Sequence, residues 1–134
     1  NEALLSDNKK IKLDNQGSVI SELIKKSIKH NDICMIFEFL EQSVDINVLS
    51  DQFKSKIKRK GIMVVGFIDN NQPFLACSIT DDLAMKYDAV SIIKEGAKLI
   101  EGGGGGRKTF AKAGGKNKKN IHTAIARMKK MVIS

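Results

Sequence analysis

Three short apolar runs constrain the fold of this chain more than any other feature. They are each long enough for a strand buried on both faces and too short for a typical helix, and they cover residues 33–39, 62–68 and 74–79. Residues 69–72, Asp-Asn-Asn-Gln, separate the second run from the third and are typical of a tight hairpin turn. We therefore predict three strands, of which the last two pair as a hairpin.

Apolar residues at helical spacing predict helices near residues 18–29, 45–59, 88–101 and 117–131. Asp45 and Asn117 are suited to cap the second and fourth of these helices, and Gly61 and Gly102 are expected to end the second and third. A helix between the first two strands predicts a βαβ unit. The predicted fold class is α/β, a single compact domain with a mixed sheet of three to five strands flanked by helices and a glycine-rich loop before the last helix.

A glycine-rich and strongly basic segment follows the third predicted helix. Gly102–Gly106 is a run of five glycines, and Gly114-Gly115 follows it. Residues 1–101 hold 14 basic and 15 acidic residues, whereas residues 102–134 hold nine basic residues and no acid, so the net charge of +8 comes from the last quarter. An open glycine backbone among cations is suited to bind phosphates. A flexible linker is the alternative, but the apolar residues between the two glycine groups disfavour it.

We predict that this loop and the helix after it form a nucleic-acid-binding surface. Arg107 is the first candidate for a phosphate contact, since a guanidinium group offers parallel N–H donors. The other candidates are the neighbouring glycines and lysines: Gly103, Gly104, Gly105, Gly106, Lys108, Lys112, Gly114, Gly115, Lys116, Lys118 and Lys119. The scarcity of aromatic residues favours recognition of RNA shape and backbone over base stacking. The alternative is a loop that packs on the domain with solvated lysines.

A second basic cluster lies at the end of the helix predicted over residues 45–59. It consists of Lys54, Lys56, Lys58, Arg59 and Lys60. Cations at a helix C-terminus interact favourably with the negative end of the helix dipole, and this is the first interpretation of the cluster. A phosphate contact is the alternative, and the sequence leaves both open.

The sequence contains no recognisable catalytic or metal-binding motif. His30 and His122 are isolated, and the spacings of a P-loop, a dinucleotide fingerprint and a serine elbow are absent. Cys34 and Cys77 lie in apolar runs, which indicates reduced core residues of a cytoplasmic protein. No apolar stretch reaches the roughly 20 residues of a membrane span. We therefore expect no catalytic residue, metal or cofactor in this chain.

The glycine run, Arg107 and the segment Ala111-x-Ala113-Gly114-Gly115-Lys116 resemble the C-terminal domain of alanyl-tRNA synthetase, one of a group of domains also appended to DHH-type phosphoesterases. Upstream, Ala89-x-x-Ile92-Ile93-Lys94-Glu95 matches the helix of this family. The resemblance covers residues 18–134. Residues 1–17 are expected to be a linker or an extension from a longer parent chain, since the sequence begins at Asn1 and not at Met. Lys108-Thr109-Phe110 departs from the family's usual Pro-Asp-apolar pattern and puts loop geometry taken from relatives in doubt.

The resemblance implies a non-catalytic domain that binds tRNA near the outer corner of its L shape and dimerises in some members. The parent chain would join alanine to tRNA with ATP and edit mischarged products in a zinc-dependent domain, and both sites would lie outside this chain. Two alternatives remain open. One is the nucleic-acid-binding domain of a DHH-type phosphoesterase, disfavoured because Arg107 stands where those relatives usually have a histidine. The other is a structural dimerisation module.

Overall fold

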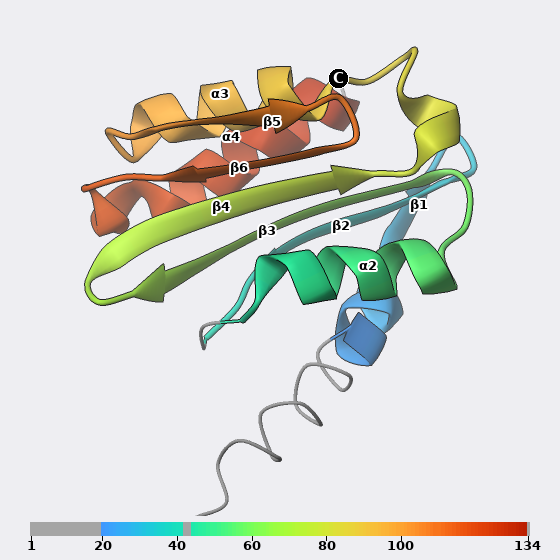
Figure 1. Cartoon of the computed structure of the whole chain (residues 1–134), viewed down its shortest axis with the longest axis horizontal. Helices are drawn as coiled ribbons and strands as arrows, with labels where there is room; N and C mark the ends of the chain where they lie inside the picture. Colours follow the sequence, from blue (N-terminus) through green and yellow to red (C-terminus); the bar gives the residue numbers. More distant parts are fainter. Residues whose placement is uncertain (1–19, 42–43, 134) are drawn as a thin grey trace, which may run out of the picture.

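The computed structural model describes residues 20–41 and 44–133, and within them six strands form one mixed sheet (Figure 1). The strand order is β1-β2-β3-β4-β6-β5. Only β2 and β3 are parallel among the described pairs, as the predicted βαβ unit requires. The strands are β1 (Ile28–His30), β2 (Ile33–Phe39), β3 (Gly61–Asp69), β4 (Gln72–Ile79), β5 (Gly103–Arg107) and β6 (Phe110–Gly114).

Helices cover both faces of the sheet and enclose two cores. α3 (Ala89–Leu99) and α4 (Ile121–Ile133) pack on one face, with Met35, Val64, Leu75 and Cys77 among the buried residues beneath them (Figure 1). α2 (Ile46–Lys56) and a short helix over residues 20–25 cover part of the other face. The α/β class, the single domain and the mixed sheet are thus confirmed.

The predicted boundaries of α2 are correct at its start and wrong at its end. The Asp45 side chain accepts hydrogen bonds from the backbone N–H groups of Asn47 and Val48, at 3.0 and 3.3 Å, and so caps the helix. The helix ends at Lys56, because Ile57 adopts an extended conformation, with φ −108° and ψ 90°. Gly61 therefore does not end the helix but begins β3.

α3 ends at Leu99, two residues before the predicted end at residue 101. Glu101, and not Gly102, takes the left-handed conformation after the helix, with φ +55°. The Gly102 N–H donates to the Ala97 carbonyl at 2.9 Å and the Glu101 N–H donates to the Lys98 carbonyl at 3.4 Å, the two bonds of a Schellman motif. After β6, Asn117 caps a 3₁₀ turn (Lys118–Asn120), and α4 follows directly.

The helix predicted over residues 18–29 extends too far. In the described part it ends at residue 25, and residues 28–30 form β1 instead. Asn31 and Asp32 have φ of 54° and 66° and connect β1 to β2 in a two-residue hairpin. Asn and Asp adopt this left-handed conformation at low cost.

The sheet exceeds the predicted three to five strands partly because the glycine segment is itself part of it. Gly103–Arg107 forms the edge strand β5, which pairs antiparallel with β6, and β6 pairs with β4. The segment is therefore a hairpin along the sheet and not a loop at one end. β1, the other addition, lies at the opposite edge.

Candidate nucleic-acid interface

The β5–β6 hairpin is fastened to the domain at both ends. At its turn, the Lys108 carbonyl accepts from the Ala89 N–H at 2.9 Å and the Thr109 carbonyl accepts from the Ile79 N–H at 2.8 Å. At the other end, the Gly115 N–H donates to the Pro73 carbonyl at 3.0 Å. These bonds join the hairpin to β4 and to the start of α3. Its backbone is therefore held in place before any ligand arrives, which lowers the entropy cost of binding.

The five glycines at residues 102–106 divide into two groups. A Cβ atom added to Gly102, Gly104 or Gly106 would overlap the backbone carbonyl oxygen of residue 114, 112 or 110, respectively. A Cβ atom added to Gly103 or Gly105 would meet nothing within 4 Å. The first group is required for β5 to approach β6 and the neighbouring backbone. Packing within the described residues does not require the second group, which leaves the strand backbone uncovered.

Gly103 lines a hollow of about 440 Å³ between β6 and the start of α2, and the half-buried Gly105 lies opposite Lys112 on the same sheet face. Gly103, Gly114 and Lys112 line it, together with residues 44–47. Lys112 pairs with Gly105 and with Ala76, so it lies on the sheet face that carries α2. The site therefore combines a flat glycine surface with one exposed ammonium group.

Two phenylalanines that were not predicted as site residues also line this hollow. The rings of Phe67 and Phe74 stack with centroids 5.5 Å apart and an interplanar angle of 22°. The predicted turn at residues 69–72 contained the signal for this pair. In a two-residue hairpin around Asn70 and Asn71, Phe67 and Phe74 are cross-strand partners on the same face.

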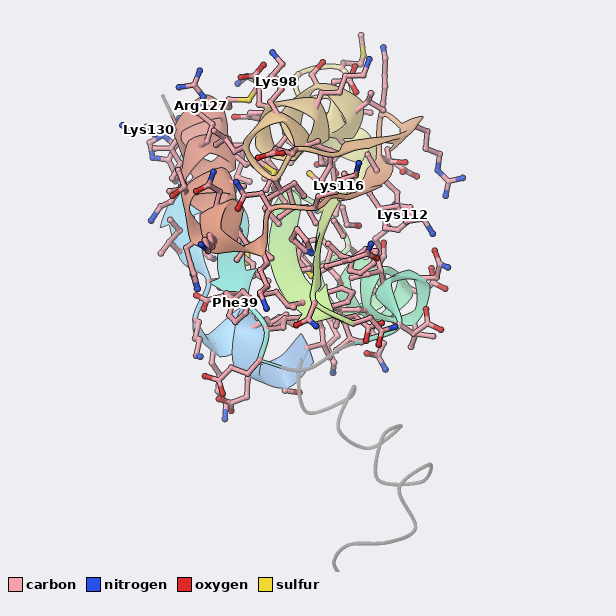
Figure 2. The ribbon with its side chains drawn as sticks, turned by 90° about the vertical axis from the view of Figure 1, so that its left-hand side faces the viewer. Phe39, Lys98, Lys112, Lys116, Arg127 and Lys130 are labelled. Carbon is pink, nitrogen blue, oxygen red and sulfur yellow. The ribbon has the colours of Figure 1, made fainter. Side chains whose placement is uncertain are left out.

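The predicted cations are distributed over both ends and both faces of the sheet. Arg107 and Lys108 lie at the hairpin turn, and Lys112 lies between the two ends of β6. Lys116, Lys118 and Lys119 follow the opposite end of β6, where the Lys118 ammonium donates to the Asn71 side chain at 2.9 Å. The cations of α4 lie on the other face, so that Lys112 and Lys116 are well separated from Arg127 and Lys130 (Figure 2). The hairpin and α4 thus do not form one continuous basic face.

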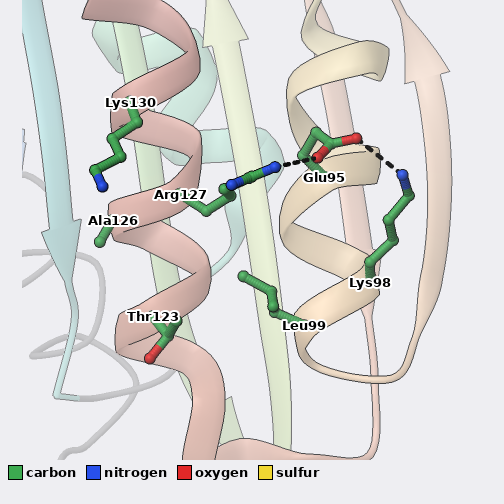
Figure 3. Close-up of a pocket in the computed structure, with 7 residues that line it drawn as sticks. All are labelled: Glu95, Lys98, Leu99, Thr123, Ala126, Arg127 and Lys130. Atoms are coloured by element: carbon green, nitrogen blue, oxygen red, sulfur yellow. Dashed lines mark hydrogen bonds and ion pairs between the residues drawn. The ribbon is translucent and has the colours of Figure 1, made fainter.

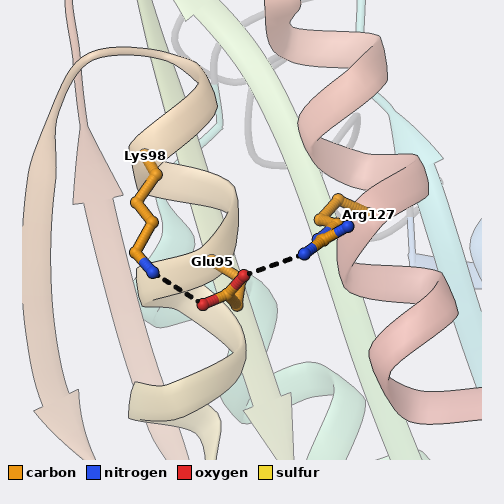
Figure 4. A network of polar contacts seen from close by, with 3 residues as sticks. All are labelled: Glu95, Lys98 and Arg127. Carbon is orange, nitrogen blue, oxygen red and sulfur yellow. Dashed lines mark hydrogen bonds and ion pairs between the residues drawn. The ribbon is translucent and has the colours of Figure 1, made fainter.

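Arg127 belongs to a separate groove of about 520 Å³ between α3 and α4 (Figure 3). The Glu95 carboxylate accepts a hydrogen bond from the Lys98 ammonium at 2.9 Å and lies 3.6 Å from the Arg127 guanidinium (Figure 4). The hydrogen bond and charge of Lys98, followed by the charge of Arg127, lower the pKa of Glu95. This carboxylate offsets part of the charge of the groove and links the two helices.

Residues 20–41 and 44–133 contain no cluster of His, Cys, Asp and Glu that could hold a metal ion. Cys34 and Cys77 are buried and unpaired, and burial, with a smaller effect of the Asp88 charge, raises the pKa of the Cys77 thiol. Both cysteines thus behave as core residues. In the same part of the chain, every helix is too short or too polar to span a bilayer.

The sequence is similar to a known domain family and to alanine–tRNA ligases. The family model of the DHHA1 domain matches residues 32–134. The alanine–tRNA ligase of Bacteroides fragilis (strain ATCC 25285) is 33% identical over 117 residues, which cover 86% of this chain and 13% of the ligase. The chain therefore spans only a small fraction of the curated relatives that it matches.

Solved structures share the fold at low sequence identity. The C-Ala domain of Aquifex aeolicus alanyl-tRNA synthetase matches with a TM-score of 0.71 and 20% identity, over 81% of this chain and 98% of that one. RecJ from Thermus thermophilus in complex with Mg²⁺ matches with a TM-score of 0.58 and 10% identity, over 90% of this chain and 18% of that one. The arrangement of the strands and helices is thus common to these domains.

Proposed function

The chain belongs to the DHHA1 domain family, as its glycine motif indicated, and we propose that it is the tRNA-binding C-terminal domain of an alanine–tRNA ligase. The ligase relatives and the C-Ala fold support this parent. The domain itself would carry no catalytic step. It would hold tRNA for aminoacylation with ATP and for zinc-dependent editing elsewhere in the parent, in the cytoplasm.

The observation that carries the proposal is the uncovered glycine surface at Gly103 and Gly105 beside Lys112. Without side chains on this face, an RNA sugar or phosphate can approach the strand backbone closely. The ammonium group of Lys112 and the guanidinium group of Arg107, at the hairpin turn, supply the opposite charge. Because the hairpin is fastened at both ends, it presents a rigid surface suited to the shape of a folded RNA.

The charge distribution sets the expected strength of this interaction. Contacts with about three to five phosphates predict that log K falls with log salt at a slope of roughly −2 to −4. The cations of α4 would contribute little, since they lie on the other face of the sheet. Dimerisation stays a prediction, which light scattering over a range of protein concentrations can test.

A salt titration of tRNA binding tests the proposal. The chain and the double variant Arg107→Ala, Lys112→Ala are titrated against a fluorescent tRNA transcript, and the variant should bind more weakly with a shallower salt slope. The matched control is Lys94→Ala, Lys129→Ala, which removes the same charge from exposed positions on α3 and α4. Wild-type affinity and slope in the hairpin variant would show that RNA binds elsewhere.

A further inference from the structure

We propose that a second surface, the α2-end hollow, binds RNA backbone phosphates at a position separate from the glycine hairpin. Its cations are Lys29, Lys56, Lys58, Arg59 and Lys60. The proposal rests on the function proposed above and extends it. One folded RNA would contact the protein at two places, and each place can be removed by mutation independently.

The α2-end hollow has a volume of about 690 Å³ and lies between the C-terminal end of α2, β1 and the starts of β2 and β3. Five cations line it, against a single carboxylate, Asp32. In the part of the chain that the structure describes, none of these five side chains forms an ion pair with a carboxylate. This contrasts with the α3–α4 groove, where Glu95 contacts both Lys98 and Arg127. Asp82, which lies outside the lining, interacts with the Arg59 charge and offsets part of it. With five cations against these two carboxylates, the α2-end hollow still presents an excess of positive charge.

The helix dipole does not account for this cluster. α2 ends at Lys56, so only Lys54 and Lys56 lie in its last turn. Lys58, Arg59 and Lys60 follow the helix, and Lys29 belongs to β1. The dipole effect falls off within the last turn of a helix. Four of the five cations that line the hollow thus lie outside α2, and the dipole of this helix does not explain their position.

The backbone of Lys60 provides a second observation. Lys60 has φ +55°, a left-handed conformation that glycine adopts at lower cost. Two hydrogen bonds hold it there: its N–H donates to the Asp82 carboxylate at 3.0 Å, and its carbonyl accepts from the Cys34 N–H at 2.7 Å. A lysine kept at a strained and fixed backbone position points to a role for its side chain. That side chain is exposed at the rim of the hollow.

The position of the hollow favours RNA as its ligand. The C-terminal end of α2 and the β5–β6 turn lie at the same end of the sheet (Figure 1). There the Ile79 N–H donates to the Thr109 carbonyl and the Thr80 N–H donates to the Gly61 carbonyl, so the start of β6, the end of β4 and the start of β3 lie side by side. At a strand spacing of about 4.8 Å, the edge of the hollow at β3 is about 10 Å from β6 and its far edge at β1 is about 20 Å away, distances that a few nucleotides span.

The residue types also favour a nucleic acid over a protein partner. Protein interfaces centre on aromatic and apolar anchors and are depleted in lysine. The apolar side chains in this hollow, Ile24 and Ile57, are half-buried, and four of its five cations are lysines. Lysines that act as point charges are typical of contacts with phosphates, which position an RNA without reading its sequence.

The test uses Lys58→Ala, Arg59→Ala in the same tRNA titration, with Lys94→Ala, Lys129→Ala as the charge-matched control. Loss of two phosphate contacts predicts a salt slope that is shallower by about 1.4–1.8 and an affinity about 25- to 60-fold weaker near 0.1 M salt. Lys60→Gly removes one cation and also relieves the left-handed strain. It should bind about 5- to 8-fold more weakly while its Tm stays the same or rises.

The outcomes separate the two proposals. Wild-type RNA binding by Lys58→Ala, Arg59→Ala would refute the proposal that the α2-end hollow binds RNA. An acidic protein would then be the better candidate for a partner of that surface. Weaker binding by this variant, with wild-type binding by Arg107→Ala, Lys112→Ala, would support RNA binding at the α2-end hollow and refute RNA binding at the hairpin. Weaker binding by both variants, with the control unchanged, would support two contact sites on one RNA. Equal losses in the control would refute both, since only total charge would then matter.

Discussion

Alanine substitutions along β5 should separate the glycines that the sheet requires from those that a ligand approaches. A Cβ atom added to Gly104 would overlap the Lys112 carbonyl oxygen and lie 2.5 Å from the Ala113 Cβ atom. A Cβ atom added to Gly105 would meet nothing within 4 Å, and Gly105 is not in a left-handed conformation. The two substitutions add the same methyl group one residue apart. Gly104→Ala should therefore lower stability, whereas Gly105→Ala should weaken RNA binding without lowering stability.

The size of the stability effect follows from the contacts. Overpacking of this kind costs about 1–3 kcal/mol, so Gly104→Ala should lower the free energy of unfolding by that amount. With an unfolding entropy of about 2.1 cal/mol/K per residue, a chain of this length should lose about 4–11 °C in Tm. Gly105→Ala meets no clash and restricts the unfolded chain, so it should be stabilising by up to about 1 kcal/mol.

The assays are thermal unfolding by circular dichroism and titration with the tRNA transcript. Gly105→Ala should keep or raise the Tm yet bind RNA more weakly, because its methyl group stands where the RNA backbone approaches. Gly103→Ala is the second variant of the same kind. Wild-type RNA affinity in both would show that RNA does not use this surface. A wild-type Tm for Gly104→Ala would contradict the pairing of β5 with β6.

Three further predictions concern stability. Ser50→Ala should cost about 1–3 kcal/mol in urea unfolding, because it leaves the buried Ser78 hydroxyl, now 2.8 Å from the Ser50 hydroxyl, without its partner; the double alanine variant should cost less than the sum of the single changes. Asp45→Ala removes the α2 N-cap and should cost about 1 kcal/mol, whereas Asp45→Asn should retain most of that stability. Burial favours a raised pKa for Asp82, but hydrogen bonds from the Thr80 side chain and the Lys60 N–H, with the Arg59 charge, outweigh it, so the pKa is lowered. Asp82 therefore stabilises the fold above its unfolded pKa, and this contribution is lost as pH falls through its folded pKa. Asp82→Asn should be less stable than wild type at neutral pH. A stability difference that persists undiminished in strong acid would refute this.

Local rules account for the parts of the fold that the sequence predicted. The strands near residues 33–39, 62–68 and 74–79 follow from short apolar runs, and the turn at Asn70-Asn71 follows from two residues that adopt positive φ, here 52° and 63°. α3 and α4 follow from apolar stripes with the helical period. Each of these signals involves neighbours within a few residues, so it can be read without the rest of the chain.

The tertiary structure decided the two edges of the sheet. Glycine has little intrinsic preference for a strand, and β5 forms because β6 supplies its hydrogen-bond partners and α3 packs against it. β1 has three residues and depends in the same way on β2. No local pattern identifies such strands, because the free energy that stabilises them comes from distant segments.

The tertiary structure also decided which charges act together. The sequence located the excess of positive charge after Glu101 and the glycines among it. It did not show that Lys112 and Arg127 lie on opposite faces of the sheet, or that Lys29 lies beside Lys58 and Arg59. Which side chains share a surface depends on strand order and on the face that each helix covers. Both are set by the packing of the whole core. The number of cations can therefore be read from the sequence, but their position on a common surface is seen only in the fold.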